Sequence, residues 1–514
     1  MVFISCMRLC RKISERIPKE QVKKRIKMDN FSKMIFDEDE DFSFLRSYTQ
    51  HGYEDRHYLQ KILFSVKRPN VVFPLNSEDI QILSTPANFY NKLKELIRKS
   101  KERIILSSLY LGTGPMEMDL MNLIKKQVNQ NPGMKLSFLL DHHRGNRINS
   151  QDGSSLSSKS LLQPLASKAE ASFFLSPLYG SFIRRYLFSP VPQFNELAAV
   201  QHMKCYIFDN TVLISGANLS ELYFTNRQDR YICLHNQGAL CDYLSEVISF
   251  VSRLGMQLKE NGSLEPHSSC PYPILSRGKD RRYLQKAVQF DFEQLEKKFQ
   301  KPETDWLDYN TLIIPRLQMN CFGINHDREH CEQVFKGLQG VQSAHISSGY
   351  FNLHNDYRIA LANYRGYNTV NILVPSLDSN GFSGGKGIKK YVPAAYYNLV
   401  YKFMKHCDQF RVNVRIFTYE RPGWTFHAKG MWVDIDEGTH YFEFGSSNYG
   451  RRSANRDLEL QFSLVTIRKR IHSIFQEEKN ELWKYAKPLD DLNDIRKLVP
   501  FPSRIISFLG KSYL

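Results

Sequence analysis

The sequence that decides the fold is HMKCYIFDNTVLISGAN, from His202 to Asn218, together with its counterpart HAKGMWVDIDEGTHYFEFGSSN, from His427 to Asn448. Each stretch opens with an H-x-K-x4-D motif, and two β-rich runs on either side of a polar turn indicate a β-hairpin. Each then ends in small residues and an asparagine. A lone histidine is more often structural than catalytic, but two copies in the same context indicate one shared function.

The two motifs supply six candidate catalytic residues, which are His202, Lys204, Asp209, His427, Lys429 and Asp434. Residues two apart on a strand point to the same face, so each histidine and its lysine are expected to meet one phosphate. The aspartate comes seven residues after the histidine and falls on the opposite face of an unbulged strand. We therefore expect the aspartates to hold the hairpins in shape rather than to touch substrate.

A neutral amide follows each motif, and an acid follows each amide at the same spacing. Asn218 and Asn448 are expected to donate hydrogen bonds to phosphate oxygens. Eleven residues beyond each asparagine lies an acid, Asp229 in the first copy and Glu459 in the second. A carboxylate in such a place orients a histidine ring and stabilises its imidazolium, as the acid of a catalytic triad does. We expect each acid to orient the histidine of its own copy.

These residue types predict a two-step phosphoryl transfer. One neutral histidine attacks phosphorus while the other, protonated, donates to the leaving oxygen, and the roles then reverse. The lysines and asparagines hold the equatorial oxygens. An unperturbed histidine pKa of about 6.5 lets one ring be neutral and the other charged near neutral pH. We expect no metal and no cofactor.

The repeat extends beyond the hairpins. Residues 107–110 read Ser-Ser-Leu-Tyr, and residues 347–350 read Ser-Ser-Gly-Tyr. A predicted helix at 87–101 precedes the first of these stretches, a second at 116–128 follows it, and the strand KLSFLLD comes next, which is βαβ order. A repeat of this size predicts an α/β fold in which duplicated α/β domains pack face to face around one shared active site.

The length of 514 residues is enough for more than one domain, since domains run to roughly 100 to 200 residues. The net charge of +17 and the pI near 9.3 favour phosphates, nucleic acid or an anionic membrane without choosing among them. The predicted organisation is a basic N-terminal segment with an acidic linker at 1–45, a first repeat at 46–260, a connector at 261–305, a second repeat at 306–470 and a C-terminal tail at 471–514.

Several features bear on where the protein works. The first 28 residues are rich in arginine and lysine and resemble a mitochondrial presequence, with a basic surface helix as the alternative. Nine cysteines without a C-x-x-C pair favour isolated thiols in a reducing compartment over a disulfide framework or a zinc site. No apolar run approaches the roughly 18 to 20 residues needed to span a bilayer, which leaves a peripheral membrane role open.

Five stretches together resemble a known family: SSLYLGTG at 107–114, LLDHHRGNR, SNGFSGGKG, QHMKCYIFD and FHAKGMWVD. The motif pair is the signature of the phospholipase D superfamily, and within it these contexts resemble the eukaryotic mitochondrial phosphatidylglycerophosphate synthases. The resemblance implies duplicated phospholipase D-like domains. It also implies transfer of a phosphatidyl group from CDP-diacylglycerol to sn-glycerol 3-phosphate, giving phosphatidylglycerophosphate and CMP in the cardiolipin pathway.

The same resemblance implies roles and a location. The first motif is usually credited with catalysis, so His202 is the candidate nucleophile that forms a phosphohistidine, and His427 the acid and base, although the sequence itself does not fix this order. The location implied is the matrix face of the mitochondrial inner membrane, bound peripherally. Two alternatives stay open: a phosphatidylserine synthase of the same superfamily, and a phospholipase D-like nuclease or phosphodiesterase. No nucleic-acid module is recognisable, so we expect no nucleic-acid partner. The oligomeric state stays unknown.

Further residues are candidates for binding substrate or nucleotide phosphates. They are Ser107, Ser108, Leu109, Tyr110, Leu111, Gly112, Thr113, Gly114, Arg144, Arg147 and Lys386, with Lys389 and Lys390 beside the last. The run at 107–114 lacks the G-K-[ST] ending of a P-loop, so we interpret it as a strand end near the phosphate. Two segments, 171–188 and 498–514, mix apolar and basic residues and are candidates for contact with an anionic membrane, with ordinary core packing as the alternative.

Overall fold

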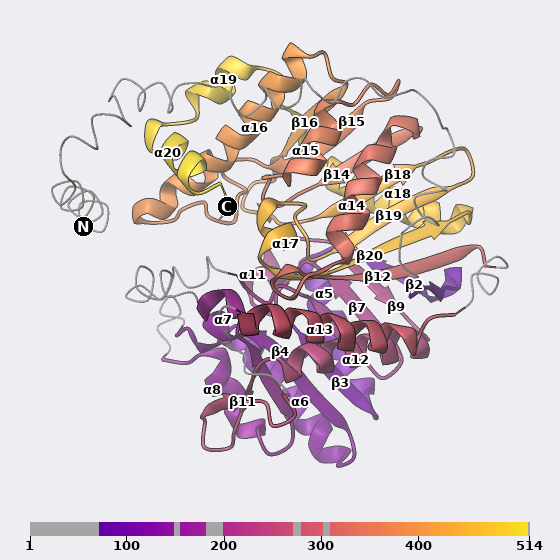
Figure 1. Ribbon diagram of the computed structural model, residues 1–514, viewed down its shortest axis with the longest axis vertical. Helices are drawn as coiled ribbons and strands as arrows, with labels where there is room; N and C mark the ends of the chain where they lie inside the picture. Colours follow the sequence, from indigo (N-terminus) through magenta and orange to yellow (C-terminus); the bar gives the residue numbers. More distant parts are fainter. Residues whose placement is uncertain (1–70, 149–154, 181–198, 271–278, 302–308, 512–514) are drawn as a thin grey trace. The chain divides into compact units, whose positions relative to one another are not determined.

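The computed structural model describes residues 71–148, 155–180, 199–270, 279–301 and 309–511. The chain divides into two units, 1–55 and 56–514, and the fold described below is that of the second unit (Figure 1). The basic segment and acidic linker predicted for 1–45 lie outside the described residues, so the presequence stays a prediction.

The first half of this unit forms a nine-stranded sheet with the order β11-β10-β5-β4-β3-β6-β7-β9-β2. The neighbours β5, β4 and β3 are parallel, whereas every pairing from β3 to β6 and onward is antiparallel. The strands are β2 (Ile80–Leu83), β3 (Arg103–Ser107), β4 (Lys135–Asp141), β5 (Glu170–Phe174), β6 (Cys205–Phe208), β7 (Thr211–Ser215), β9 (Tyr231–Leu234), β10 (Met256–Leu258) and β11 (Leu264–Pro266).

The second half forms a ten-stranded sheet with the order β1-β12-β20-β19-β18-β14-β15-β16-β21, and β13 pairs with β12. Here β14, β15 and β16 are parallel, and β18, β19 and β20 continue antiparallel. The strands are β1 (Phe73–Pro74), β12 (Thr311–Met319), β13 (Ile324–Asn325), β14 (Ser343–Ser347), β15 (Val370–Pro375), β16 (Val414–Tyr419), β18 (Gly430–Asp434), β19 (His440–Gly445), β20 (Leu458–Thr466) and β21 (Ala486–Pro488).

The two sheets are copies of one topology. The series β5-β4-β3-β6-β7-β9 in the first corresponds to β16-β15-β14-β18-β19-β20 in the second, with the same parallel and antiparallel neighbours. The hairpins predicted from the two motifs are β6–β7 and β18–β19, at equivalent places. The predicted α/β class with a duplicated sheet is therefore confirmed.

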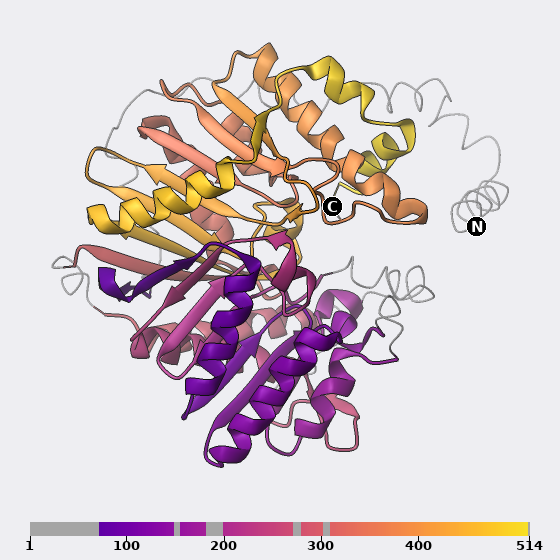
Figure 2. The same cartoon turned by 180° about the vertical axis from the view of Figure 1, so that it is seen from behind.

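Helices cover the sheets because their apolar residues recur at helical spacing. In the first half, Thr85 caps α5 (Pro86–Lys99), which packs beside α6 (Pro115–Gln130) on one face of the sheet (Figure 2). The predictions at 87–101 and 116–128 locate both helices to within about two residues. Among the described residues, no helix has the length and apolar composition needed to cross a bilayer.

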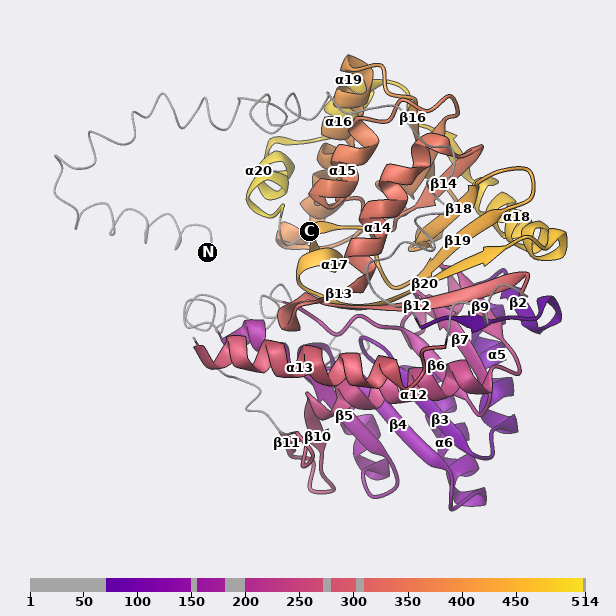
Figure 3. The same ribbon diagram turned by 45° about the vertical axis from the view of Figure 1, so that its right-hand side comes forward.

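One apolar cluster joins the two halves. It combines Ile207 and Val212 of the first hairpin with Phe442 and Phe444 of the second, and with the long helices around them. Those helices are α12 (Gly238–Arg253), α13 (Lys279–Lys297) and α18 (Lys469–Trp483). Figure 3 shows α13 alongside α12 below β12. The range 261–305, predicted as a connector, thus contains a helix that packs into the shared core, and the predicted tail, 471–514, supplies β21; the domain boundaries themselves stay predictions.

Asp209 anchors the first hairpin to the neighbouring strand. It lies in the β6–β7 turn with φ at 49°, a left-handed conformation that aspartate tolerates better than most residues. Its carboxylate accepts hydrogen bonds from the backbone N–H groups of Lys101, Glu102 and Arg103 at 2.9, 2.8 and 2.9 Å. These bonds fix the turn at the start of β3.

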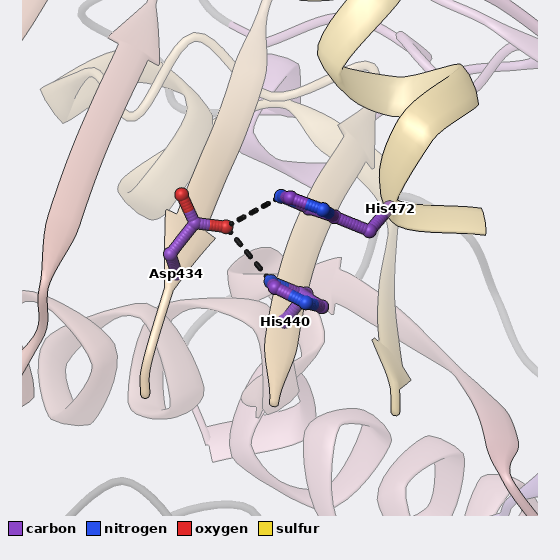
Figure 4. A group of neighbouring side chains, drawn as sticks. All are labelled: Asp434, His440 and His472. Atoms are coloured by element: carbon purple, nitrogen blue, oxygen red, sulfur yellow. Dashed lines mark hydrogen bonds and ion pairs between the residues drawn. The ribbon is translucent and has the colours of Figure 1, made fainter. Parts of the chain in front are cut away.

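Asp434 holds the second hairpin in the same way. Its carboxylate accepts a hydrogen bond from Ser343 Oγ at 2.7 Å, at the start of β14. Asp434 Oδ1 also lies 2.8 Å from His440 Nδ1 and 3.1 Å from His472 Nε2, with the two rings stacked 3.7 Å apart (Figure 4). Burial opposes ionisation, but the hydrogen bonds from Ser343 and His440 outweigh it and lower the pKa of Asp434.

The donor atoms of Asp434, His440 and His472 lie close enough together to hold a metal ion. Both ring nitrogens, however, lie within hydrogen-bond distance of Asp434 Oδ1, so the contacts of this cluster do not require an ion. The cluster is therefore explained by hydrogen bonding, and Asp209 and Asp434 both act as anchors of their hairpins.

Candidate active site

The two halves exchange backbone hydrogen bonds at the histidines. The His202 N–H donates to the carbonyl oxygen of Leu458 at 2.8 Å, and the His427 N–H donates to that of Gln228 at 2.8 Å. Leu458 and Gln228 are equivalent residues, since they immediately precede Glu459 and Asp229, the corresponding acids of the two halves. Each histidine is thus held against the half to which it does not belong.

This exchange crosses the histidine–acid pairs. His202 Nδ1 lies 2.8 Å from Glu459 Oε2, and His427 Nδ1 lies 2.6 Å from Asp229 Oδ2. Each of these histidine–acid pairs is called a dyad below. The expectation that each acid orients the histidine of its own copy is therefore wrong. In the first half, His202 precedes β6 and Asp229 precedes β9, and β7 lies between these strands. In the second half, His427 precedes β18 and Glu459 lies at the start of β20, and β19 lies between them. The acid of the other half, in contrast, lies directly beside the ring.

The crossed contacts favour the tautomer with the hydrogen on Nδ1 in both rings, although at His427 the Lys429 Nζ also lies 2.8 Å from Nδ1 and 3.3 Å from Nε2. A carboxylate that accepts the Nδ1 hydrogen leaves Nε2 of a neutral ring with its lone pair free. Asp229 and Glu459 are buried, so water does not compete for their oxygens. Each ring therefore presents Nε2 as the nitrogen that can attack phosphorus or move a proton.

The lysines lie on the same strand face as their histidines. Lys204 Nζ donates to the backbone carbonyl of His202 at 2.8 Å, and Lys429 Nζ does the same to His427 at 2.8 Å. Both lysines are buried, and Lys429 Nζ lies 3.8 Å from Asp229 Oδ2. Two cations and two acids thus surround the ring pair within one desolvated cluster.

Burial shifts every ionisation in this cluster toward the neutral form. It raises the pKa of Asp229 to about 6 and that of Glu459 to about 7, although nearby lysines oppose both shifts. It lowers the pKa of Lys429 to about 8 and that of Lys204 well below the ordinary lysine value. The histidines share this cause, and the neighbouring lysines lower their pKa further.

The two rings differ in their surroundings. The His202 side chain is 13% exposed, whereas that of His427 is 3% exposed. The Tyr223 hydroxyl lies 3.4 Å from His427 Nε2, and the Tyr350 ring stands edge-on to the His427 ring at 5.6 Å. His202 is therefore the more accessible ring, and His427 works from an aromatic enclosure.

The two asparagines are buried beside the motifs, and their Oδ1 atoms have no hydrogen-bond partner among the described residues. Gly216, two residues before Asn218, leaves space for the dyad instead of for the phosphate. A Cβ at Gly216 would lie 2.7 Å from Asp229 Oδ1 and 2.9 Å from Lys429 Nζ. The small residue is needed because a buried acid and a lysine of the other half meet there.

The run at 107–114 borders the asparagine turn of the first hairpin. The Gly112 N–H donates to the Leu219 carbonyl oxygen at 2.8 Å. Ser107 Oγ, however, accepts a hydrogen bond from Gln201 Nε2 at 2.6 Å and is fully buried. The run thus lies near the motifs while its first serine holds the backbone; substrate contact by the run stays a prediction.

The predicted cations lie on two different parts of the fold. Arg144 places its guanidinium 4.4 Å from the centre of the Tyr110 ring, beside the 107–114 run, and Arg147 ends the short helix α7 (His142–Asn146). The lysines of the Gly-rich loop are exposed around η9 (Gly387–Tyr391), and the described contacts of the two dyads do not include them. These lysines are Lys386, Lys389 and Lys390.

Sequence reasoning passed over two groups at His427. Tyr350 belongs to the repeated Ser-Ser-x-Tyr stretch, so the repeat itself was a usable signal. Tyr223 lies five residues after Asn218, but the residue five after Asn448 is Ser453. Tyr223 therefore could not be identified by comparing the two copies.

Comparison with known proteins gives the family. No family model matches the chain. The chain is 31% identical over 451 residues to the mitochondrial CDP-diacylglycerol--glycerol-3-phosphate 3-phosphatidyltransferase of Gallus gallus, covering 80% of this chain and 79% of that protein. It is 30% identical over 477 residues to the probable enzyme of that name from Dictyostelium discoideum, covering 89% and 81%. The chain belongs to this phosphatidyltransferase family.

A solved structure agrees on the fold. The phosphatidylserine synthase of Haemophilus influenzae superposes with a TM-score of 0.63 at 18% identity, covering 89% of this chain and all of that one. At this identity the likeness concerns the fold alone. The predicted phosphatidyltransferase family and its duplicated architecture are thus confirmed together.

The crossed dyads can be tested without turnover. In selectively ¹⁵N-histidine-labelled protein, Asp229→Asn should change the Nδ1 and Nε2 shifts of His427, because the amide no longer selects one tautomer, and should leave those of His202 unchanged. Glu459→Gln should do the reverse. Each variant is the control for the other, and a response of the histidine in the same half would contradict the crossing.

Proposed function

We propose that this chain transfers the phosphatidyl group of CDP-diacylglycerol to sn-glycerol 3-phosphate, forming phosphatidylglycerophosphate and releasing CMP. The observation that carries the proposal is the pair of crossed dyads, each with a buried lysine, in a chain 31% identical to an enzyme named for this reaction. Two histidines with opposite protonation are what a two-step transfer requires.

In the first step, His202 Nε2 attacks the phosphorus of the phosphatidyl phosphate. The P–O bond to CMP breaks, and protonated His427 gives its proton to the leaving oxygen, so the products are phosphatidyl-His202 and CMP. The greater exposure of His202 supports its role as nucleophile. Glu459 and Asp229 stabilise the positive charge that each ring carries in turn.

In the second step, the neutral His427 takes the proton of the acceptor hydroxyl. That oxygen attacks phosphorus, the P–N bond to His202 breaks, and phosphatidylglycerophosphate leaves. Lys204 and Lys429 neutralise the phosphate oxygens in both steps, while the asparagine amides donate hydrogen bonds to them. No proton is lost from the cycle, because the one given to CMP in the first step is recovered from the acceptor in the second.

Product identification tests the reaction. Purified protein incubated with CDP-diacylglycerol and glycerol 3-phosphate should release CMP and form phosphatidylglycerophosphate, and His202→Ala should abolish both while melting at the same temperature. Serine or single-stranded DNA supplied in place of the acceptor or donor tests the alternatives. Phosphatidylserine formation, DNA cleavage without lipid turnover, or CMP release by the folded variant would each contradict the proposal.

The ionisations of the cluster define a pH window for kcat/KM, which reports groups of the free enzyme. The proton that His427 donates is shared with Asp229, so this pair must hold one proton and Asp229 does not set the acid limb. The rate also requires an ionised Glu459, whose raised pKa is about 7, and a charged Lys429, whose lowered pKa is about 8. Activity should therefore fall below about pH 7 as Glu459 gains a proton, and above about pH 8 as Lys429 loses its proton.

The alkaline limb has its own control. Lys429→Arg keeps its charge throughout this range, so it should move the alkaline limb upward and leave the acid limb in place, even where the larger side chain lowers the absolute rate. A pH–rate profile with an unmoved alkaline limb would contradict the assignment to Lys429.

We also propose peripheral binding to an anionic membrane, through the C-terminal helix α20 (Phe501–Leu509). The burial of this helix is the reverse of the usual pattern for a surface helix, because the polar Ser503 and Ser507 are buried. The apolar Phe501, Phe508 and Leu509 are exposed. The buried serines are satisfied, since Asn398 Nδ2 donates to Ser507 Oγ at 2.7 Å and Ser503 Oγ donates to the Tyr391 carbonyl at 3.0 Å. Exposed lysines on the adjoining η9 suit anionic headgroups.

The location proposed is the matrix face of the mitochondrial inner membrane. It is supported by the names of vertebrate relatives, which are called mitochondrial, and by the basic N-terminal segment. The other membrane candidate, 171–188, lies partly outside the described residues.

The membrane face is tested with vesicles. Replacing Phe501, Phe508 and Leu509 together by serine should reduce binding to cardiolipin-containing vesicles by at least about tenfold, because the apolar area that enters the interface is lost. Tyr283→Ser with Phe290→Ser, exposed aromatic positions on α13, is the matched control and should bind as the parent does. Equal loss in both variants, or none in the first, would rule out α20.

A further inference from the structure

Arg227 places a guanidinium beside the His427 side of the site. Its Nε donates to Thr425 Oγ1 at 3.1 Å, its Nη1 to the Tyr223 hydroxyl at 3.3 Å and its Nη2 to the Gly381 carbonyl at 3.5 Å. Arginine has five N–H donors, so these contacts leave donors unused. Among the described residues, no carboxylate lies within ion-pair distance of Arg227.

The equivalent position in the other half carries the opposite charge. Arg227 precedes Asp229 by two residues, and the residue two before Glu459 is Asp457. Asp457 accepts hydrogen bonds from Arg452 Nε at 2.6 Å and from a backbone N–H, so that side of the site is neutralised internally. The Arg227 side is not, and a largely buried cation without a carboxylate calls for an anion.

The position of this cation relative to the chemistry is defined by Tyr223. The Tyr223 hydroxyl lies 3.3 Å from Arg227 Nη1 and 3.4 Å from His427 Nε2. The Tyr223 hydroxyl therefore lies between Arg227 and His427 Nε2, the nitrogen that exchanges protons with the leaving and attacking oxygens. Gly381 keeps the Gly-rich loop against this place, because a Cβ there would collide with the Tyr350 hydroxyl.

Two phosphates other than the transferred one visit this side of the site, and geometry separates them. The CMP phosphate is joined to the transferred phosphorus through a single oxygen, so in the proposed reaction it lies directly beside the transferred phosphate. The phosphate of glycerol 3-phosphate is five bonds from the attacking hydroxyl oxygen, a span of about 6 Å for bonds of about 1.5 Å. Because His427 Nε2 and Arg227 Nη1 both contact the Tyr223 hydroxyl, an acceptor whose hydroxyl lies at His427 Nε2 can reach Arg227 with its phosphate.

We propose that Arg227, with the hydroxyls of Tyr223 and Tyr350, forms the binding site for the phosphate dianion of the acceptor. This inference rests on the proposed function and adds to it the reason for the choice of acceptor. A guanidinium binds a phosphate dianion through two parallel hydrogen bonds. Serine offers no such dianion, so this site favours glycerol 3-phosphate over an amino-acid acceptor.

The test separates the acceptor from the nucleotide. Exchange of labelled CMP into CDP-diacylglycerol needs only the first step, whereas product formation needs the acceptor as well. Arg227→Gln should raise the KM for glycerol 3-phosphate by about ten- to a hundredfold, the loss expected for a charged hydrogen bond, and should leave the exchange rate within about threefold. Arg227→Lys keeps the charge without the fork and should lie between the two.

A binding measurement gives an answer that does not depend on turnover. Calorimetric titration of glycerol 3-phosphate should show binding to the parent protein and to Arg253→Gln, a control arginine that also makes no described ion pair and lies at the end of α12. It should show a loss of about tenfold or more in Arg227→Gln, with unchanged melting temperature.

The outcomes are distinct. An equal fall in exchange and transfer would assign Arg227 to the nucleotide and overturn the inference, as would unchanged acceptor binding in Arg227→Gln. Failure of the parent protein to form phosphatidylglycerophosphate while it still performs CMP exchange would contradict the proposed function instead, and the titration would then report on the anion site by itself.

Discussion

The site depends on one exchange of backbone hydrogen bonds. Because the His202 N–H bonds to Leu458 and the His427 N–H to Gln228, each catalytic strand end is fixed by the opposite half. The acids that follow those two residues are thereby delivered to the rings at 2.8 and 2.6 Å. Backbone bonds have a fixed direction and length, so this geometry does not rely on flexible side chains to bring the groups together.

Much of the fold could be predicted from sequence because the relevant signals are local. Alternation across the motifs locates both hairpins, and helical spacing locates α5 and α6 closely. The repeat gives the duplication. The parity argument also separated Asp209 and Asp434 from the histidines, since it needs only the pleat of a single strand. These are properties that neighbouring residues determine by themselves.

The pairing of acid and histidine could not be read in the same way. Asp229 and Glu459 each stand eleven residues after the asparagine of their own half, and this spacing does not show whether an acid serves its own half or the other. That choice is made by sheet order, in which a hairpin strand intervenes within each half. Arg227 was not predicted for a different reason. Its counterpart in the second half is Asp457, and a comparison of the two copies identifies only residues that are the same in both.

The crossed arrangement has a consequence for how such a protein can arise. A half whose histidine needs an acid from outside is chemically incomplete when alone, but two identical copies related by a twofold axis would complete each other. The symmetric pair would hold both dyads without any second sequence. Joining the copies in one chain removes the requirement that they stay identical. Arg227 on one side and the Asp457–Arg452 pair on the other differ in a way that is impossible for two identical subunits of a dimer.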